Sequence, residues 1–328
     1  MTTIMIGADS MNRTQTMNLV IALGGNALTP PGGTSRASSP DGAANVIADL
    51  VELGYNIVVT HGNGPQVGYA LLKDVAAPHK VPRLSLTYLG AQTEGELGSL
   101  VALAIRRALE HKNLAIPVTA IVTHAIVNPS DPDALTSTKP IGPVFLDEEA
   151  AEKAAHITGL VTIEDRNGKR LAVPSPKPCD VLEKDAIRTL LGKGHVVVAA
   201  GGGGIPVTKV PSGGYGEFDA VIDKDRTSAY LAGAIQADHL IILTDIEGVY
   251  VDFKKPTQQF VNRATVGEME AYLNSGAFGT GSMGPKVEAA CMFVRVTGNS
   301  AFIGHLEQAA EVIAGNAGTE VISGGERL

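Results

Sequence analysis

The sequence is poor in cysteine, in uninterrupted apolar runs and in net positive charge, and each shortage argues against a class of protein. The two cysteines, Cys179 and Cys291, lie in neither a metal-binding nor a redox spacing, which fits a reducing compartment. No apolar run approaches the ~20 residues that a membrane-spanning helix requires. The formal net charge is −8, so a nucleic-acid partner is not expected.

Two common nucleotide-binding signatures are also missing. The sequence contains no Gly-x-x-x-x-Gly-Lys-[Ser/Thr] loop, which argues against a Walker-type NTPase. No Gly-x-Gly-x-x-Gly stretch follows directly on a predicted strand to open a βαβ unit, which argues against dinucleotide binding. A phosphate site in this chain must therefore be built from other loops.

The composition is that of a globular protein with many tight turns. Of 328 residues, 44% are hydrophobic and 18% are charged, and this length is enough for a large α/β core or for two lobes. The 38 glycines cluster in short runs, which favours turns where the backbone approaches a ligand. Residues 1–16 are polar and lack an apolar segment of signal-peptide length, so we interpret residues 1–17 as an extension before the first strand.

Short apolar runs alternate with helical patterns along the chain. The run Asn18–Leu23 is apolar from Leu19 onward, as in a strand buried on both faces of a parallel sheet. Further strands are expected at residues 57–60, 118–122, 195–200, 239–244 and 301–303. Helices are expected from a cap at Asp41 to Gly54, over 85–112, over 183–191 and near 306–314. This alternation predicts an α/β fold with an open, mainly parallel sheet between helices.

Three glycine-containing loops directly follow predicted strands. They are Gly24-Gly25-Asn26, residues 61–68 (His-Gly-Asn-Gly-Pro-Gln-Val-Gly), and the four glycines at 201–204. Backbone N–H groups of such loops can face a phosphate, although a lone Gly-Gly pair is more often an ordinary tight turn. The four glycines favour close contact between backbone and ligand, with a flexible hinge as the alternative. We interpret His61 as a hydrogen-bonded structural residue rather than a general base.

Residues 220–225 (Ala-Val-Ile-Asp-Lys-Asp) place Lys224 between Asp223 and Asp225, where an apolar run ends and a helical pattern begins. An Asp at this point can cap the helix. The lysine can neutralise phosphoryl oxygens, while a carboxylate can bind Mg²⁺ or hold neighbouring lysines. A capping Asp beside a solvated Lys is the alternative for the hexapeptide taken alone.

Residues 128–178 are rich in proline and interrupt the α/β rhythm, so we expect them to project from the sheet. An Asn-Gly pair at 167–168 predicts a β-hairpin between two apolar runs. The stretch Thr-Lys-Pro-Ile-Gly-Pro at 138–143 puts Lys139 among stiff residues, from where it can swing over a site as part of a lid. A surface lysine in a proline-rich turn is the alternative.

Polar groups from the last third of the chain are predicted to join the same edge of the sheet. Thr244 and Asp245 end a predicted strand at its carboxyl end, where ligands bind in open parallel sheets. Residues 279–286 open a helix with Lys286 near its N-terminus, a position that already favours anions. Glycine loops, three lysines and two aspartates are therefore expected to converge. Such a site suits phosphoryl transfer by positioning and charge, without a covalent nucleophile.

Several of these segments resemble motifs of the carbamate kinases, a branch of the amino-acid kinase family. The segments are residues 22–27, 61–68, 138–143, 173–178, 199–207, 220–225, 244–250 and 281–289, and the resemblance covers about residues 18–322. Their order and spacing are more specific than any one motif. The first glycine pair and the Thr-Asp corner are shared by the wider family. The Thr-Lys-Pro-Ile-Gly-Pro stretch and the lysine between two aspartates resemble carbamate kinases in particular.

The resemblance implies one amino-acid-kinase domain over residues 18–328, with a lobe at 18–212, a protruding subdomain near 126–177 and a nucleotide-side lobe at 213–328. It implies a cytoplasmic, homodimeric phosphotransferase without a nucleic-acid or membrane partner. The implied reaction is reversible phosphoryl transfer between carbamoyl phosphate and ADP, giving ATP and carbamate, with Mg²⁺. Carbamate breaks down to ammonia and carbon dioxide. The resemblance does not distinguish between arginine fermentation and purine or allantoin breakdown as the pathway in which the enzyme acts.

The resemblance also implies roles for residues at matching positions. Lys139, Lys224 and Lys286 would neutralise transition-state charge, and Asp225 would hold the lysines in place. The transferred phosphoryl group and the small substrate would lie against Gly24, Gly25, Asn26, Gly62, Asn63, Gly64, Gly202 and Gly203. The nucleotide would lie near Thr244, Asp245, Tyr250, Met283 and Gly284. The metal ligands are left open.

The chain departs from the family pattern at its N-terminal extension, at residues 31–40 and 128–137, and after Gly95. Two alternatives to a carbamate kinase therefore stay in view. One is a related kinase that acts on another small carboxylate or carbamate-like acid. The other is a nucleotide-binding regulatory protein without turnover. The complete set of three lysines and Asp225 counts against the regulatory protein, because a sensor needs binding but not this whole set of charges.

Overall fold

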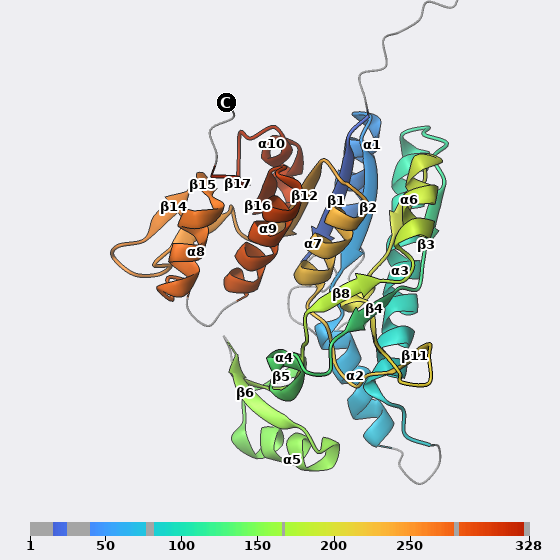
Figure 1. The fold of residues 1–328 in the computed structure, drawn as a ribbon, viewed down its shortest axis with the longest axis vertical. Coiled ribbons are helices and arrows are strands. Elements are labelled where there is room, and N and C mark those ends of the chain that lie inside the picture. The colour runs from blue at the N-terminus through green and yellow to red at the C-terminus, as the bar shows by residue number, and fades with distance from the viewer. Residues whose placement is uncertain (1–15, 25–39, 77–81, 166–167, 279–281, 325–328) are drawn as a thin grey trace, which may run out of the picture.

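The computed structural model describes residues 16–24, 40–76, 82–165, 168–278 and 282–324. At its centre is an eight-stranded sheet in the order β15-β17-β16-β12-β1-β2-β9-β3 (Figure 1). Neighbouring strands are parallel, except that β16 and β17 are antiparallel. This arrangement confirms the predicted open, mainly parallel sheet. The strands are β1 (Asn18–Leu23), β2 (Asn56–His61), β3 (Val118–Ala120), β9 (Val196–Val198), β12 (His239–Thr244), β15 (Arg263–Thr265), β16 (Ala301–His305) and β17 (Thr319–Ile322).

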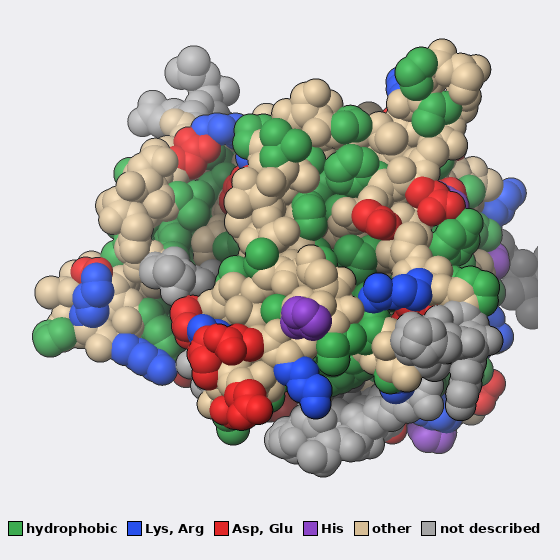
Figure 2. Space-filling view, turned by 90° about the horizontal axis from the view of Figure 1, so that it is seen from below, with side chains coloured by type: hydrophobic (Ala, Val, Ile, Leu, Met, Phe, Trp, Pro, Cys, Tyr) green, Lys and Arg blue, Asp and Glu red, His purple; other side chains and the backbone are tan. Residues whose placement is uncertain are grey.

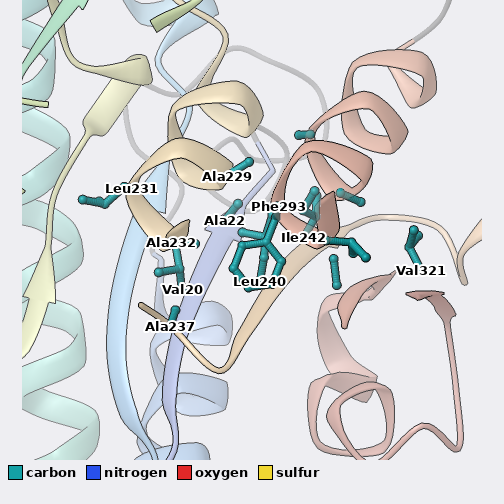
Figure 3. Close-up of a cluster of buried hydrophobic side chains, with 14 of the residues drawn as sticks. Val20, Ala22, Ala229, Leu231, Ala232, Ala237, Leu240, Ile242, Phe293 and Val321 are labelled. Carbon is teal, nitrogen blue, oxygen red and sulfur yellow. The ribbon is translucent and has the colours of Figure 1, made fainter. Parts of the chain in front are cut away.

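Strand β1 shows why helices cover the sheet on both faces. Successive side chains of a strand point to opposite faces, and all the apolar side chains of β1 are buried. Val20 and Ala22 lie in one buried cluster with Phe293 (Figure 3), whereas Leu19 and Ile21 lie in another. The first cluster is closed by α6 (Lys184–Gly192), α7 (Lys224–Ala234) and α9 (Met283–Thr297), and the second by α1 (Asp41–Glu52), α3 (Leu86–His111) and α10 (Ala309–Ile313).

The carboxyl ends of the central strands lie level with one another. Leu23 at the end of β1 pairs with His61 of β2 on one side and with Leu243 of β12 on the other. The loops that follow these parallel strands therefore begin side by side at one edge of the sheet. Ligands bind at this edge in open α/β sheets.

A smaller layer projects from this edge, at the bottom of Figure 1. We call residues 132–174 the protruding part; it contains α4 (Pro132–Leu135), β5 (Ser137–Phe145), α5 (Glu148–Thr158), β6 (Val161–Asp165) and β7 (Gly168–Pro174). Its sheet has the order β5-β7-β6, and the antiparallel β6–β7 pair confirms the predicted hairpin. Figure 2 views the molecule from this side, where acidic side chains gather beside a histidine over α5.

A four-stranded sheet is built from strands that come before and after the protruding part in the sequence. Its order is β11-β10-β4-β8, from β4 (His124–Val127), β8 (Pro178–Val181), β10 (Ile205–Lys209) and β11 (Tyr215–Glu217). The other described elements are α2 (Gly64–Val75), β13 (Val249–Val251), β14 (Gln259–Val261), α8 (Val266–Asn274) and the 3₁₀ turns Gly201–Gly203 and Leu306–Gln308. Among the described residues, no helix combines the length and the apolar character needed to cross a membrane.

Local boundaries differ from the sequence-based expectations at several points. Asp41 is the first residue of α1 rather than its cap, because the N-cap position belongs to Pro40. The strand expected at 195–200 is shorter, since the chain turns at Ala200, whose φ of 51° is left-handed. Residues 220–223 form no strand before α7. There the backbone instead pairs with the end of β7, through a hydrogen bond from Val221 N to Pro174 O of 3.1 Å.

Candidate active site

A cleft of about 590 Å³ opens at the carboxyl edge of the central strands. It lies where the strand-end loops meet β5 of the protruding part and the first turns of α7 and α9. From the residues selected by sequence, its lining contains Gly24, Gly62, Asn63, Gly64, Lys139, Gly202, Lys224, Asp225, Thr244, Asp245 and Lys286. Gly25 and Asn26 lie outside the described residues.

Asp225 lies between two lysines of the cleft. Its Oδ1 accepts a hydrogen bond from Lys224 Nζ at 2.5 Å, and its Oδ2 accepts one from Lys286 Nζ at 3.0 Å. All three side chains are less than a tenth exposed. One carboxylate therefore fixes two ammonium groups, which come from the first turns of α7 and α9.

Lys139 is held by a different carboxylate, that of Asp223. Oδ1 of Asp223 caps α7 by accepting from the backbone N–H of Asp225 at 2.9 Å, while Oδ2 accepts from Lys139. The capping residue thus also anchors the lysine that the protruding part contributes. The sequence indicated Asp223 only as a neighbour of Lys224, because a contact across 84 positions leaves no trace in local spacing.

Opposite charges act against the effect of burial in this cluster. Burial alone would raise the pKa of Asp225, but Lys224 and Lys286 outweigh it and hold that pKa below its usual value. Burial is likewise outweighed at Asp223, where Lys139 contributes most to a lowered pKa. Burial lowers the pKa of Lys224, whereas the two aspartates raise the pKa of Lys286 against the effect of burial. Three lysines face two aspartates, a composition that suits an anionic ligand.

The strand that carries Lys139 packs tightly against helix α2. A Cβ atom at Gly68 would lie 2.1 Å from the backbone nitrogen of Gly142, so helix and strand touch backbone to backbone. Gly142 also has a φ of 74°, which favours glycine. This contact fixes β5, and with it the point from which Lys139 enters the cleft.

The second glycine loop places the N-terminus of α2 at the cleft. Gly62, Asn63 and Gly64 line the cleft there. The N-cap residue is Asn63, but its side chain makes no capping bond and instead donates to Thr93 Oγ1 at 3.0 Å. Within the described part of the chain, the N-cap side chain thus leaves the first N–H groups of the helix uncapped, a setting that favours a bound anion.

The run of four glycines is required by packing inside the protein. A Cβ atom at Gly201 would lie 2.5 Å from the His61 ring, and one at Gly202 would lie 2.2 Å from the Asn63 side chain. At Gly203 it would approach a backbone carbonyl to 2.6 Å. Only Gly202 of the four lines the cleft. The loop is therefore a packed turn rather than a flexible hinge, and contact with other residues explains most of its glycines.

The residues selected for the nucleotide separate into two groups. Thr244 and Asp245 line the cleft, together with Lys286. Met283, the first residue of α9, is buried in the core. A Cβ atom added at Gly284 would lie 3.8 Å from a leucine of α8. Neither of these last two lines the cleft among the described residues.

Tyr250 also lies away from the cleft lining. Its ring packs between Phe253 and Phe260, with centroids 5.9 Å and 5.1 Å away. Its hydroxyl donates to Glu247 at 2.7 Å. Tyr250 therefore belongs to a small aromatic group around β13 and β14 in this structure.

Two arginines that the sequence analysis did not select also line the cleft. Arg226 binds Glu288 of α9 through Nε and Nη2 at 3.2 Å and 3.0 Å, and Asp133 of the protruding part through Nη1 at 2.9 Å. Arg170 donates from Nε to Gly142 O at 3.1 Å. Its Nη2 is buried and has no partner within the described part of the chain. Their basic character was visible in the sequence, but their place beside the lysines was not.

The described residues offer no protein cage for a metal ion. Among them, no three His, Cys, Asp or Glu side chains gather closely enough to hold one. The buried carboxylates of the cleft, Asp223 and Asp225, are already paired with lysines. Mg²⁺ is commonly bound through substrate phosphates, water and one or two carboxylates. The donor set therefore fits a magnesium ion that arrives on the phosphates of a nucleotide.

Comparison with known proteins agrees with the fold and the motifs. Residues 17–305 match the family model described as the amino acid kinase family. The chain is 41% identical to the carbamate kinase of Trichomonas vaginalis, over 93% of this chain and 99% of that protein. It is also 41% identical to the carbamate kinase of Thermococcus kodakarensis, over 93% of this chain and 98% of that protein.

Solved structures give the same result. The carbamate kinase of Giardia lamblia bound to citric acid superposes with a TM-score of 0.88 at 33% identity, covering 94% of this chain and 99% of that one. The same enzyme bound to AMP-PNP superposes with a TM-score of 0.83 at 34% identity, with the same coverage. The chain therefore belongs to the amino acid kinase family and, within it, to the carbamate kinases.

Proposed function

We propose that the protein catalyses reversible transfer of a phosphoryl group between carbamoyl phosphate and ADP, giving ATP and carbamate. The observation that carries the proposal is the cluster of Lys139, Lys224 and Lys286, held by Asp223 and Asp225 in a cleft lined by glycine loops. Identity to carbamate kinases over nearly the whole chain supports this pair of substrates. Carbamate then decomposes to ammonia and carbon dioxide.

The lysine cluster would act by charge and position. In phosphoryl transfer, negative charge spreads over the equatorial oxygens of the group in flight. Lys139, Lys224 and Lys286 come from three separate elements and are already held by the two aspartates before substrate binds. Groups that need no reorganisation at the moment of reaction stabilise a transition state most effectively. The cluster therefore supplies the main electrostatic part of the catalysis.

The proposed reaction requires no general base. The carbamate oxygen that attacks ATP is already anionic, and the oxygen that leaves carbamoyl phosphate is stable as an anion. Both carboxylate oxygens of Asp225 are occupied by lysines, at 2.5 Å and 3.0 Å. Asp225 is therefore assigned to positioning the lysines rather than to proton transfer.

We infer that the second substrate is a nucleotide that carries Mg²⁺. The Giardia carbamate kinase has been solved with AMP-PNP, and this chain shares its fold at 34% identity. Thr244 and Asp245 at the end of β12 and Lys286 on α9 would lie along the nucleotide phosphates. When bound, Mg²⁺ would neutralise phosphate charge.

A coupled assay tests this function directly. The purified full-length protein is given carbamoyl phosphate and ADP, with and without Mg²⁺, and ATP is followed through a coupled indicator reaction. The reverse direction is measured with ATP, ammonia and bicarbonate. Magnesium-dependent turnover in both directions is expected. Turnover with acetyl phosphate but not carbamoyl phosphate would indicate a kinase for another carboxylate, and nucleotide binding without turnover would indicate a regulatory protein.

We also propose that the enzyme is a homodimer and acts in the cytoplasm. Helix α3 exposes Leu100 and Leu103, and Val122 is exposed just beyond the edge strand β3. A second copy could cover these apolar side chains. Both cysteines are free, as expected in a reducing compartment. Light scattering should report a dimer for the purified protein and a monomer for Leu103→Glu; a monomer in both cases would contradict the proposed interface.

A further inference from the structure

Behind the glycine loops lies a second cavity, of about 350 Å³. Glu94 of α3, His61 at the end of β2, Gly201 and Arg106 contribute to its lining. Both Glu94 and His61 are buried, with 3% and 0% of their surface exposed. Neither side chain lines the cleft where phosphoryl transfer is proposed. The burial of two titratable groups at this point therefore needs a separate explanation.

Helix α3 holds the two loops from behind. Oε1 of Glu94 accepts hydrogen bonds from the backbone N–H of Gly201 at 3.1 Å and of Thr123 at 3.2 Å. The preceding residue, Thr93, accepts from the side chain of Asn63 at 3.0 Å. Two successive residues of one helix thus bind the loop after β2 and the loop after β9. Glycines of both loops line the cleft, so their spacing affects the substrate.

The hydrogen bonding of His61 defines which of its nitrogens accepts. Its Nδ1 lies 3.2 Å from the carbonyl oxygen of Gly62, and because a carbonyl only accepts, this nitrogen is assigned the proton. Nε2 of the neutral ring is then a bare acceptor. Nε2 of His61 and Oε2 of Glu94 are both buried without a partner among the described residues. Both side chains flank Gly201, where an added Cβ would lie 2.5 Å from Nε2 and 3.0 Å from Glu94 Cγ.

A single proton resolves this conflict between two acceptors. If Glu94 were ionised, a charged oxygen and a nitrogen lone pair would both be buried and unsatisfied, which is costly. A protonated carboxyl group can donate from Oε2 toward His61 Nε2, either after a small side-chain rotation or through one water in the cavity. Oε1 remains free to accept from Gly201 and Thr123. Oε2 of Glu94 and Nε2 of His61, the two unpartnered atoms of this pair, would then both be satisfied.

We propose that Glu94 is a positioning residue that works in its protonated form, sharing its Oε2–H with His61 Nε2 while its Oε1 holds the backbone of Gly201 and Thr123. This inference rests on the proposed function, because the loops held in this way line the phosphoryl cleft. Loss of the proton removes the donor and places a negative charge behind the loops. The loops then lose their fixed spacing, and turnover falls.

The surrounding charges agree with two neutral side chains. Burial raises the pKa of Glu94 to about 8; its backbone hydrogen bonds lower that pKa in part, and Glu183 raises it slightly. Burial lowers the pKa of His61 to about 4, and the positive charge of Lys224 acts in the same direction. Arg106 is the remaining charged residue in the lining of the cavity. Near neutral pH the pair therefore carries one shared proton and no net charge.

This arrangement gives stability a distinctive pH dependence. Folding raises the pKa of Glu94 from 4.5 to about 8, so the free energy of unfolding falls as pH rises between these values. Folding lowers the pKa of His61 from 6.5 to about 4, which has the opposite effect between those two values. Between about pH 6.5 and pH 8 only Glu94 of this pair contributes, and stability should fall as pH rises.

The decisive comparison is between Glu94→Gln and Glu94→Met. The Gln amide oxygen can accept from Gly201 and Thr123, and its NH₂ group can donate to His61 without titrating. Met has a similar size but offers neither group. We would measure kcat and KM in the carbamoyl phosphate assay from about pH 7 to about pH 9. Thermal unfolding without substrate would be measured over the same range.

In the wild-type protein, kcat should fall about tenfold between about pH 7 and pH 9, the loss expected one unit above a pKa near 8. Glu94→Gln should keep much of its kcat at pH 7 and lose less at pH 9. Its Tm should also vary less than that of the wild type between about pH 7 and pH 8. Glu94→Met should lower kcat at every pH, with KM for ADP within about twofold.

Wild-type pH profiles retained in Glu94→Gln, for kcat and for Tm, would overturn the proposal, as would a Gln variant as impaired as the Met variant. If Glu94→Met does not fold, the Gln profile still decides. Because the Tm comparison needs no substrate, it tests the shared proton even if the protein does not use carbamoyl phosphate. Failure of the inference can thus be distinguished from failure of the proposed function.

Discussion

Two aspartates, separated by one residue, anchor lysines from three elements of the fold. Asp223 is the N-cap of α7 and Asp225 belongs to its first turn, so their carboxylates diverge. Asp223 binds Lys139 of the protruding part, and Asp225 binds Lys224 and Lys286. The two aspartates of the Asp-Lys-Asp stretch therefore have different tasks, since each carboxylate binds a lysine that the other does not. Replacing either aspartate should therefore affect different lysines.

Replacement of Asp225 should lower turnover strongly. The side chain introduced by Asp225→Asn is uncharged and neutralises neither Lys224 nor Lys286. Their ammonium groups should therefore repel each other and move apart. We expect kcat to fall roughly 10²-fold or more, the scale of lost electrostatic preorganisation. The measurement is kcat of the purified variant after its fold has been verified by circular dichroism.

Asp185→Asn is the matched control for this change, because Asp185 forms an exposed ion pair with Arg188. Such pairs contribute about 0–1 kcal/mol, so kcat should stay near that of the wild type. A near-normal kcat in Asp225→Asn would contradict the positioning role of Asp225.

Lys139 and Lys286 should differ in the substrate that they serve. Lys139 enters from the protruding part, whereas Lys286 opens α9 beside Thr244 and Asp245. Lys139→Ala removes one charge-assisted contact, worth on the order of 1.5–3 kcal/mol, and should lower kcat/KM for carbamoyl phosphate. ADP affinity, measured by calorimetry without the second substrate, should change little.

Lys286→Ala provides the contrast within the same cluster. It should weaken ADP binding as well as turnover, because Lys286 lines the cleft with Thr244 and Asp245, where the nucleotide is proposed to bind. If Lys139→Ala abolished ADP binding and spared carbamoyl phosphate kinetics, the assignment of the protruding part to the small substrate would be wrong.

At the scale of elements, close backbone contacts determine where the catalytic groups stand. Helix α2 and strand β5 meet at Gly68 and Gly142, far apart in the sequence. The glycine turn after β9 packs against His61, the last residue of β2, and against Asn63 of the loop that follows. Loops that line the cleft are thus supported by other loops, and a side chain added at a contact must displace backbone.

Gly68→Ala tests the contact between α2 and β5. Its new Cβ would lie 2.1 Å from Gly142 N, a backbone atom that cannot move aside alone. We expect a loss of about 1–3 kcal/mol of stability, typical of overpacking, and a lower kcat/KM for carbamoyl phosphate because Lys139 moves with β5. Urea unfolding and steady-state kinetics measure the two effects.

Gly90→Ala is the control for helix propensity. Gly90 lies in α3 with nothing within 4 Å of an added Cβ, so alanine should stabilise the protein by roughly 0.5–1 kcal/mol. Equal behaviour of Gly68→Ala and Gly90→Ala would rule out a constraint at the contact with β5.

How far the sequence predicted these elements depends on the range of the signal. The buried strand Asn18–Leu23 and the hairpin near the Asn-Gly pair follow from local pattern, and both are present. The reason for Gly201 and Gly202 did not follow, because their neighbours, His61 and Asn63, lie about 140 positions earlier. The Asp223–Lys139 pair was missed for the same reason. Residue types indicated the chemistry of the site, whereas tertiary contacts determine which aspartate binds which lysine.

At the scale of the whole molecule, Arg226 links the protruding part to helix α9. Its side chain is 17% exposed, and its guanidinium donates to Asp133, to the carbonyl oxygen of Ser175 and to Glu288 of α9. These partners come from widely separated parts of the chain. Because Arg226 follows Asp225 directly, the same turn of α7 positions the lysines and fixes the protruding part. The link should therefore affect both stability and the binding of the small substrate.

Arg226→Lys should loosen this link without removing the positive charge. A lysine has one nitrogen and cannot reproduce a planar fork that bonds in three directions. We expect faster hydrogen exchange over residues 132–175 and a several-fold higher KM for carbamoyl phosphate, since misplacing a positioning element is costly. Arg263→Lys is the control, because Arg263 is 63% exposed and forms one surface ion pair with Glu320. Its stability should change by no more than about 0.5 kcal/mol. Unchanged hydrogen exchange over the protruding part in Arg226→Lys would show that other contacts, such as that between Gly68 and Gly142, hold it in place without the arginine.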